Sequence, residues 1–457
     1  MDSIRDHYRL EFESCALHLQ PRGRSPRTEI QMHDRHPKGG RPCASKLRAA
    51  EVLETPAPGT STGLNEISKM ERSPQNGPEN MGPRLQSSGP IAVAKLGNDL
   101  SFRDRVSEQI DFRSDFVTRP TPAMIAAMVE AAGQAPAFGL TDDPMVRQLE
   151  EDAAAKLGKD AALFCPTCTM CNQIAIYLQC ERGETVLAES NSHIFLGESG
   201  SLAALAGAMA LPVPGVRGAM DEGELRSLLR KREIQRSRSA LVVLENTHAN
   251  LGGLVIPLDH CQAISDLAHE WGVPVHLDGS RVFNASTRLG CSPASVADCA
   301  DSVSISLNKG LGAPMGAILA GTRTFIDQAA HVRQLFGGGW RPAGILAAAG
   351  VVALATMIER LEDDHRSAKS LGEKLHRLAG IEVRLADVET NILMADVAGS
   401  QCPAREFTDR LGKLDILALP ASSGPASVIR FVTHHGVSAA DVDTAAAAVA
   451  EVLTSFS

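Results

Sequence analysis

Lys309 and Asp278 are residues whose type and position together suggest chemistry. Lys309 follows the alternating apolar run 303–307, which predicts a strand, and a Gly-Leu-Gly-Ala-Pro segment comes directly after it. A lysine that is partly desolvated at a strand end has a lowered pKa and becomes a nucleophile towards a carbonyl. Asp278 ends the predicted strand 273–277, where a carboxylate can hold a cationic nitrogen of a ligand. The plainer alternatives are a solvated lysine in a turn and a surface ion pair between Asp278 and Arg281.

A turn of small polar residues, Thr167-Cys168-Thr169, lies between the predicted strand 161–164 and a predicted helix. The start of a helix offers free backbone N–H groups and the positive end of the helix dipole, which together bind phosphate. The alternative is an ordinary helix-capping turn.

The same turn carries a second pattern, because Cys165, Cys168 and Cys171 form three quarters of a bacterial iron–sulfur run. The expected fourth cysteine before a proline is missing, and Cys180 lies inside the predicted helix instead. The hydroxyl groups between the cysteines favour a phosphate over iron, so we expect no metal.

Two histidines also follow predicted strands. His193 comes after strand 184–188, and His248 comes after strand 241–244 and the polar segment 245–247. A histidine at such a position can stack on a flat ring or act as an acid or base, although most isolated histidines are structural hydrogen-bonding residues.

These candidates all lie on one type of framework. Short apolar runs alternate with helical patterns, such as 124–129, 146–157, 259–270 and the Ala-rich segment 344–357, which predicts an α/β fold. In open α/β sheets the ligand crevice lies at the carboxyl ends of the strands, so the polar residues at those ends should converge. A phosphate turn, a carboxylate for a ring nitrogen and an amine for a Schiff base are together what pyridoxal phosphate requires.

Composition narrows the functional classes. The formal charge of −9 argues against a nucleic-acid or anionic-membrane partner. Apolar runs fall short of the roughly 18 to 20 residues that a membrane span needs. Ten cysteines in a chain of 457 residues indicate reduced thiols rather than a disulfide framework, so a cytoplasmic location is expected.

Residues 1–107 differ from the rest of the chain. They hold 10 of the 25 prolines and show no sustained hydrophobic period, which predicts a disordered N-terminal extension. A translation start nearer Met70 or Met81 is an alternative.

Seven segments resemble the low-specificity L-threonine aldolases, a group of fold-type I pyridoxal-phosphate enzymes related to the β-eliminating lyases. They are residues 111–120, 166–173, 245–248, 276–284, 307–312, 337–341 and 430–434, and the similarity extends over roughly residues 110–455. The resemblance implies a large cofactor-binding domain with a mostly parallel sheet at 108–362. A small α+β domain would follow at 363–457.

The resemblance implies cofactor roles for five residues. Lys309 would form the Schiff base, and Asp278 would keep the pyridinium nitrogen protonated. His193 would stack on the ring, while Cys168, Thr169 and neighbouring amides would hold the phosphate.

It also implies substrate roles. Ser114, Arg281 and Arg430 would bind the carboxylate, with Arg281 also beside the cofactor, because a guanidinium suits a carboxylate. His248 would lie near the β-hydroxyl group. The family is typically a homotetramer with shared active sites, so Arg341 would act across an interface.

The sequence departs from the usual family pattern at several positions. Cys168 replaces a glycine of the phosphate turn, Ser280 replaces an alanine, Asn308 replaces a serine and Phe116 stands where threonine is common. If that glycine needs a positive φ, Cys168 would be strained. We expect the changes to affect substrate choice and cofactor affinity rather than reaction class.

The expected reaction is the cleavage of L-threonine or L-allo-threonine, small-molecule amino-acid substrates, to glycine and an aldehyde. Three alternatives stay open. One is another lyase reaction on the same scaffold, such as β-elimination or cleavage of a bulkier β-hydroxy amino acid. The second is a homologue that binds the cofactor without turnover, and the third is an iron–sulfur protein.

Overall fold

The computed structural model describes residues 109–134 and 138–455. The predicted extension, residues 1–107, lies outside the described residues. The strand and helix predictions agree with the observed elements, with small shifts at their ends.

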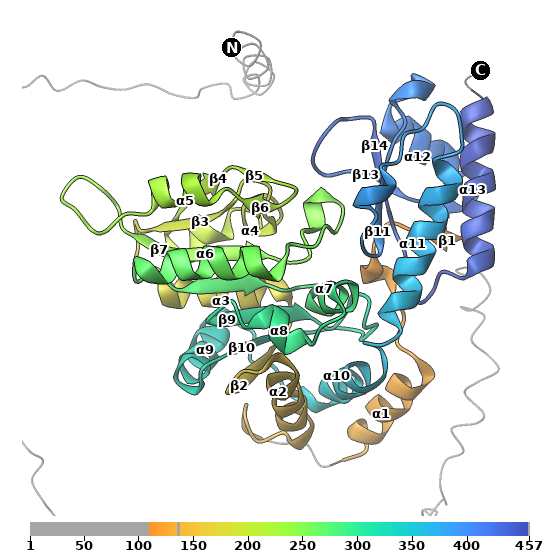
Figure 1. Ribbon diagram of the computed structural model, residues 1–457. Helices are drawn as coiled ribbons and strands as arrows, with labels where there is room; N and C mark the ends of the chain where they lie inside the picture. Colours follow the sequence, from red (N-terminus) through yellow and green to blue (C-terminus); the bar gives the residue numbers. More distant parts are fainter. Residues whose placement is uncertain (1–108, 135–137, 456–457) are drawn as a thin grey trace, which may run out of the picture. The chain divides into compact units, whose positions relative to one another are not determined.

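A seven-stranded sheet forms the centre of the fold (Figure 1). Its order is β2 (Ala161–Cys165), β10 (Ala317–Gly321), β9 (Ser302–Ser306), β8 (Val275–Asp278), β7 (Ser239–Glu245), β3 (Thr185–Glu189) and β4 (Met209–Val213). β10 runs antiparallel to its two neighbours, and the other strands run in one direction. The sheet is therefore mostly parallel, as predicted.

Alternate residues of the strands pack on opposite faces of this sheet, as the two-residue period of a strand requires. Leu163 and Leu319 pack with the helices α3 (Cys168–Gln179) and α9 (Arg323–Leu335). Phe164 and Ile318 point to the other face and join the larger core. Both faces are covered, which explains why every residue of β2, β7 and β9 is buried.

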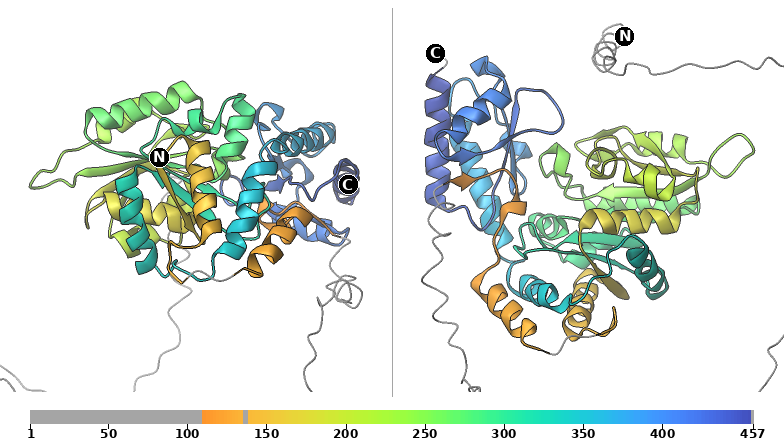
Figure 2. Two further views of the ribbon diagram at one scale, coloured as in Figure 1. Left: turned by 90° about the horizontal axis from the view of Figure 1, so that it is seen from below. Right: turned by 180° about the vertical axis from the view of Figure 1, so that it is seen from behind.

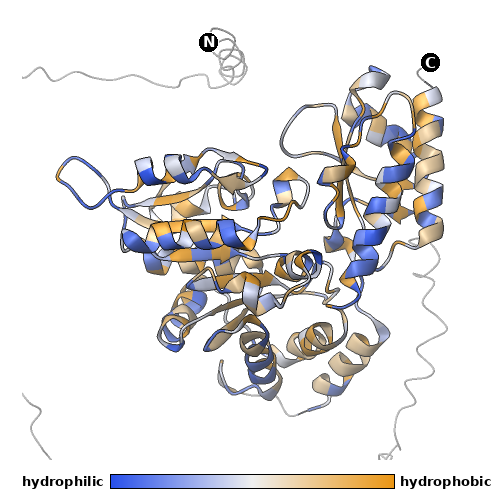
Figure 3. Cartoon of the chain, viewed as in Figure 1, coloured by the Kyte–Doolittle hydropathy of each residue, from blue (hydrophilic) through white to orange (hydrophobic). Residues whose placement is uncertain are grey.

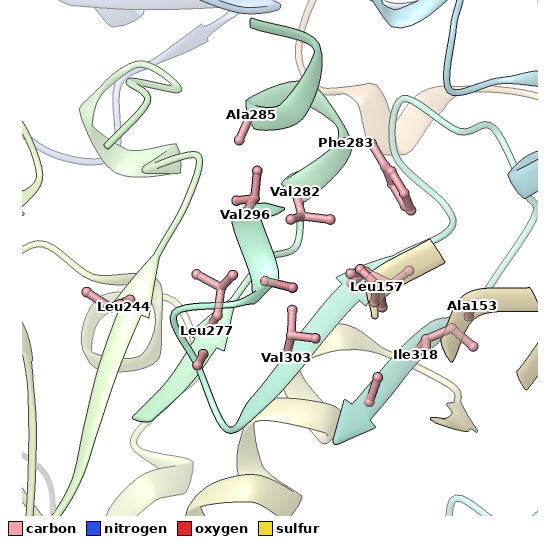
Figure 4. Close-up of a cluster of buried hydrophobic side chains, with 14 of the residues drawn as sticks. Ala153, Leu157, Leu244, Leu277, Val282, Phe283, Ala285, Val296, Val303 and Ile318 are labelled. Carbon is pink, nitrogen blue, oxygen red and sulfur yellow. The ribbon is translucent and has the colours of Figure 1, made fainter. Parts of the chain in front are cut away.

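The larger core lies between the sheet and helices on the second face. Those helices are α2 (Pro144–Leu157), α6 (Leu258–Glu270), α7 (Val282–Leu289), α8 (Pro293–Ala297) and α10 (Gly344–Thr356). Figure 4 shows Leu244, Leu277 and Val303, from three neighbouring strands, facing this core. Each fully buried side chain of this size contributes about 1.5 to 3 kcal/mol.

A second core forms around a three-stranded antiparallel sheet near the end of the chain. Its strands are β11 (Ile392–Asp396), β14 (Val428–Val432) and β13 (Leu419–Pro420). Helices α11 (Leu361–Leu375), α12 (Ala404–Gly412) and α13 (Ala439–Thr454) pack with it. The strand β1 (Ile110–Asp111) pairs with β12 (Ile416–Leu417), and Phe112 is buried in the same core, so the start of the described chain lies beside its end (Figure 2).

Helix α11, rather than α10, connects the two cores. Leu361 at its start belongs to the larger core, whereas Leu371 and Leu375 belong to the second one. Figure 3 shows that α10 is mostly apolar and α11 strongly polar along its exposed side. The predicted Ala-rich helix, α10, packs within the larger core, against α2 and α1 (Pro122–Ala132). The predicted boundary between the domains stays a prediction.

Among the described residues, no one helix has the length and apolar character to cross a membrane; α10 and α11 meet the criteria only as a pair bent by 71°.

Candidate functional site

The carboxyl ends of five strands place the predicted residues at one edge of the main sheet. Lys309 follows β9, Asp278 ends β8, and the segment of His248 follows β7. His193 follows β3, and Cys168 follows β2. Because these strands run in the same direction, their polar ends meet, as expected for an α/β crevice.

Lys309 is buried among polar groups. Its Nζ donates a hydrogen bond to Ser280 Oγ and lies 5.0 Å from the centroid of the Phe116 ring. Burial lowers the pKa of Lys309, and the nearby Arg281 guanidinium lowers it further. The amine is therefore more easily deprotonated than an exposed lysine, which a nucleophile requires. The adjacent Asn308 accepts a hydrogen bond from Ser306 Oγ at 2.9 Å.

Asp278 is fixed by a network of hydrogen bonds. Asn172 Nδ2 donates to Asp278 Oδ2 at 2.9 Å, and the backbone N–H of Ser280 donates to Oδ1 at 3.2 Å. Asn172 is itself held, because its Oδ1 accepts from Ser304 Oγ at 2.6 Å and contacts His276 Nε2 at 3.1 Å. Burial lowers the pKa of His276 to about 4, so its ring is neutral. These contacts fix the position of the Asp278 carboxylate at the end of β8.

His193 begins the short helix α4 (His193–Leu196) and is half-buried. Its Nδ1 lies 3.2 Å from Glu198 Oε1, and this hydrogen bond raises the pKa of His193. A Cβ atom on Gly197 would lie 2.6 Å from the imidazole ring, so glycine leaves room for the ring. Glu198 is buried and also accepts from Asn172 and Gln173.

His248 is fully buried, which the sequence did not indicate. Its Nε2 lies 3.0 Å from Glu189 Oε2, and Nδ1 has no hydrogen-bond partner among the described residues. Burial would lower the pKa of His248, but Glu245 and Glu189 outweigh it and raise the pKa. Glu245 Oε2 connects the two histidines, since it accepts from the His193 backbone N–H at 2.6 Å and lies 4.0 Å from His248 Nε2.

The predicted phosphate turn is the start of α3. Thr167 caps this helix, with its Oγ1 accepting from the Met170 N–H at 3.1 Å. Cys168 and Thr169 are the first two helical residues, whose N–H groups have no acceptor within a helix. Cys168 does not have the backbone strain that a positive φ would cause. It is a helical residue, and its φ is not among the positive values of the described chain. Burial raises the pKa of its thiol, and Sγ lies 3.4 Å from Ser304 Oγ.

Arg281 is already paired. Its Nε and Nη2 donate to the two oxygens of Asp115 at 2.8 and 2.6 Å, and both side chains are buried. Burial alone would raise the pKa of Asp115, but Arg281 outweighs it and holds the pKa well below its usual range. Asn391 Nδ2 also donates to Asp115, at 3.2 Å. Nη1 of the Arg281 guanidinium takes no part in this pair.

Arg430 extends from β14 on the side opposite its buried neighbours Ile429 and Phe431. Its Nη2 donates to the Arg113 carbonyl at 3.3 Å, and its buried Nε has no acceptor among the described residues. Burial and the repulsion from Arg281 lower its pKa. Ser114, also predicted to bind substrate, accepts from the Phe116 N–H at 3.2 Å.

Arg341 does not join these residues in the described chain. It is exposed, its Nη1 donates to the Phe138 carbonyl at 2.9 Å, and its guanidinium lies 5.8 Å from the Phe138 ring. Its predicted action across an interface stays a prediction.

Ligand atoms of His193, Glu198 and Asp278 all lie within 4.8 Å of one another. The amide group of Asn172 donates to both carboxylates, so it already occupies the position in which a cation would bridge them. The geometry favours a hydrogen-bonded network over metal coordination.

A cavity of about 510 Å³ lies beside the site, lined by Asn191, Asn250 and Met394 among others. Among the described residues, neither Lys309 nor Asp278 lines it. The chemistry of the strand ends therefore locates the site, rather than cavity volume.

The residues fit pyridoxal phosphate. The Lys309 amine and the Asp278 carboxylate come from the ends of two adjacent parallel strands, and the start of α3 lies at the same edge of the sheet. The sequence interpretation missed four buried partners, which are Asn172, Glu198, Asp115 and Glu245. Asn172 carried a weak signal, because Asn172 and Gln173 are polar residues about one helical turn after Cys168 and are followed by the apolar segment 174–178.

Fold and site together define a fold-type I pyridoxal-phosphate enzyme, in which the cofactor lies at the carboxyl edge of the main sheet. The model of the beta-eliminating lyase family matches residues 111–398, and the chain belongs to that family.

Curated relatives narrow the group to the low-specificity L-threonine aldolases, to which the chain also belongs. Low-specificity L-threonine aldolase 1 of Arabidopsis thaliana is 39% identical over 342 residues, which cover 74% of this chain and 94% of the relative. The low specificity L-threonine aldolase of Escherichia coli (strain K12) is 37% identical over 330 residues, covering 72% and 95%.

Among solved structures, the threonine aldolase of Leishmania major has a TM-score of 0.65 at 19% identity. The match covers 76% of this chain and 99% of that one. At this identity the likeness shows the fold, and it confirms the predicted architecture.

Proposed function

We propose that this protein cleaves the Cα–Cβ bond of L-threonine, L-allo-threonine and related β-hydroxy-α-amino acids, releasing glycine and an aldehyde. One observation carries the proposal. The buried Lys309 amine and the Asp278 carboxylate lie on adjacent strands, with the Arg430 guanidinium free of any carboxylate partner in the described chain. The family relationship supports the same reaction.

When bound, pyridoxal phosphate supplies an aldehyde carbon that takes up an amine and a pyridine ring that withdraws electrons from the breaking bond. Asp278 would hold the ring nitrogen, Lys309 the aldehyde carbon and the start of α3 the phosphate. His193 would stack on the ring.

Arg430 binds the substrate carboxylate through its free Nε, which fixes the orientation of the Cα–Cβ bond. Arg281 contributes positive charge and its remaining Nη1 donor, while Asp115 holds it in place.

His193 is the better placed of the two histidines to take the β-hydroxyl proton, because it is half-buried and Glu198 holds its Nδ1. His248, fully buried and bound to Glu189, acts through Glu245 on the position of His193.

Lys309→Ala is the decisive variant. The change removes the amine that holds the cofactor, so both the visible absorbance of lysine-bound cofactor and aldehyde release from L-threonine should disappear. Purified protein and variant are compared after incubation with pyridoxal phosphate, with glycine and aldehyde measured separately. Unchanged aldehyde release by the variant would refute the assignment, and cofactor binding without aldehyde from the unmodified protein would favour a non-catalytic homologue.

A homotetramer in the cytoplasm completes the proposal. The family supports the tetramer, the negative charge disfavours nucleic-acid or membrane partners, and eight cysteines of the described chain are free thiols. Light scattering of the purified protein tests the assembly.

A further inference from the structure

The Phe116 ring is a large apolar side chain beside a polar site. Its centroid lies 5.0 Å from Lys309 Nζ, and the residue is 57% exposed. Burial of an aromatic ring is favourable, so a ligand group that covers the exposed Phe116 ring gains contact free energy.

Its backbone is held in place. The Phe116 N–H donates to Ser114 Oγ at 3.2 Å, within the 3-10 turn η3 (Asp115–Val117). Thr118 Oγ1 donates to the Lys309 carbonyl at 3.1 Å and lies 2.9 Å from the Asp115 carbonyl. The buried pair of Asp115 and Arg281 ties the same turn to the site. The ring is therefore presented to Lys309 by a fixed segment.

The substrate amine would take the place of the Lys309 nitrogen, because pyridoxal phosphate would offer one aldehyde carbon to both amines. Bond lengths near 1.5 Å then put the substrate Cα about 1.5 Å and its Cβ about 2.5 Å from that place. Carbon atoms are in contact at about 3.5 to 4.0 Å. A ring centred 5.0 Å from Nζ is thus within reach of the group on Cβ.

We propose that Phe116 is a specificity-determining residue that favours β-hydroxy amino acids with an aromatic or branched apolar β-substituent over threonine. The inference rests on the proposed function and deepens it by naming the substrate class. More than half of Phe116 is open to solvent, so a substrate ring adds a contact instead of displacing one. Aromatic pairs gain more from such a contact than the methyl group of threonine does.

The test compares kcat/KM for L-threo-phenylserine with kcat/KM for L-threonine. Phe116→Thr should lower this ratio about tenfold, whereas Phe116→Leu, which keeps an apolar side chain, should change it by less than about threefold. Ile125→Thr is the matched control, because Ile125 is 51% exposed on α1 and has no part in the site. The control should leave the ratio unchanged.

Binding provides a second readout without turnover. L-Phenylalanine and L-alanine lack the β-hydroxyl group, and their binding is followed by the change in cofactor absorbance. Phe116→Thr should weaken L-phenylalanine binding about tenfold and alter L-alanine binding by less than about twofold.

A ratio that stays constant in Phe116→Thr, or rises because the ring had excluded bulky substrates, would overturn the inference. If the unmodified protein releases aldehyde from both substrates, that failure concerns Phe116 alone. No aldehyde from either substrate would overturn the proposed function and this inference with it.

Discussion

Lys309 is held by contacts with opposite effects on its charge. Burial and Arg281 disfavour the ammonium form, whereas the Ser280 hydroxyl and the Phe116 ring stabilise it. Ser280 is a departure from the usual alanine, so this balance is a property of this chain.

Ser280→Ala should make Lys309 deprotonate at lower pH, because an acceptor for the ammonium group is lost. At a fixed pH well below the midpoint, the neutral fraction should rise about tenfold. The measurement is the rate of pyridoxal phosphate uptake by cofactor-free protein as a function of pH. Ser280→Thr keeps the hydroxyl and serves as the control, and identical profiles for all three proteins would contradict the prediction.

Glu198→Gln should lower the pKa of His193, because the carboxylate that accepts the hydrogen bond of the protonated ring is replaced by a neutral amide. Gln173 donates to Glu198, and its own Oε1 has no partner in the described chain. Its amide can therefore rotate to donate to, or accept from, a glutamine at position 198. The His193 ring then loses its proton at lower pH, so kcat/KM should begin to rise at a lower pH than in the unmodified protein.

NMR titration of the His193 ring checks this shift directly. Glu181→Gln, which changes an exposed carboxylate elsewhere, is the control. A His193 titration that is the same in all three proteins would show that Glu198 has no such role.

At the scale of elements, the site depends on the contact between η3 and α7. The buried Asp115 and Arg281 side chains connect these two elements, and Arg281 is the residue directly before α7. Such pairs are costly to break on one side, because the remaining charge stays buried and unpaired.

Asp115→Ala should therefore reduce the free energy of unfolding by about 3 to 5 kcal/mol, and Arg281→Ala by a similar amount. The double variant should lose less than the sum of the two. Urea unfolding measures all three, with Arg226→Ala, in the exposed pair with Glu270, expected to change stability by less than about 1 kcal/mol. If the losses in free energy of unfolding of the two single variants are fully additive in the double variant, Asp115 and Arg281 do not stabilise the fold as a pair.

The stability that the Asp115–Arg281 pair contributes depends on pH. The pKa of folded Asp115 is below its ordinary value of 3.8, so its stabilisation is present above pH 3.8 and is lost as the pH falls towards the folded pKa.

At the scale of the whole molecule, the C-terminal sheet carries Arg430, the residue proposed to bind the substrate carboxylate. Arg430 lies opposite Met394 in the pairing of β14 with β11, and it reaches the Arg113 carbonyl more than 300 positions earlier in the chain. Asn391 and Asp115 add a second contact between the two parts of the site.

Arg430→Gln should weaken glycine binding to the cofactor-loaded protein by about 100-fold, because a half-buried cationic partner of the carboxylate is lost. Cofactor uptake should stay unchanged, since Arg430 has no proposed contact with pyridoxal phosphate. Absorbance titration gives both quantities, and Arg405→Gln, an exposed arginine of α12, is the control. Unchanged glycine affinity would assign the carboxylate to another residue.

Local patterns in the sequence were sufficient to predict the α/β fold, most strands and the residues at their ends. These features are local: neighbouring residues alone reveal a two-residue apolar period, a capping residue or a lysine at the end of a strand. The family relationship and the cofactor followed from the order of these motifs.

Tertiary structure alone decided which of these residues are free to act. The sequence does not distinguish the roles of Arg281 and Arg430. In the fold, the Asp115 carboxylate, 166 positions before Arg281, binds the Arg281 guanidinium, whereas Arg430 Nε has no acceptor in the described chain. His193 and His248 both follow strands, but packing leaves one half-buried and encloses the other. Ion pairing and burial depend on residues that are distant in the chain and adjacent only in the fold, so no local pattern encodes them.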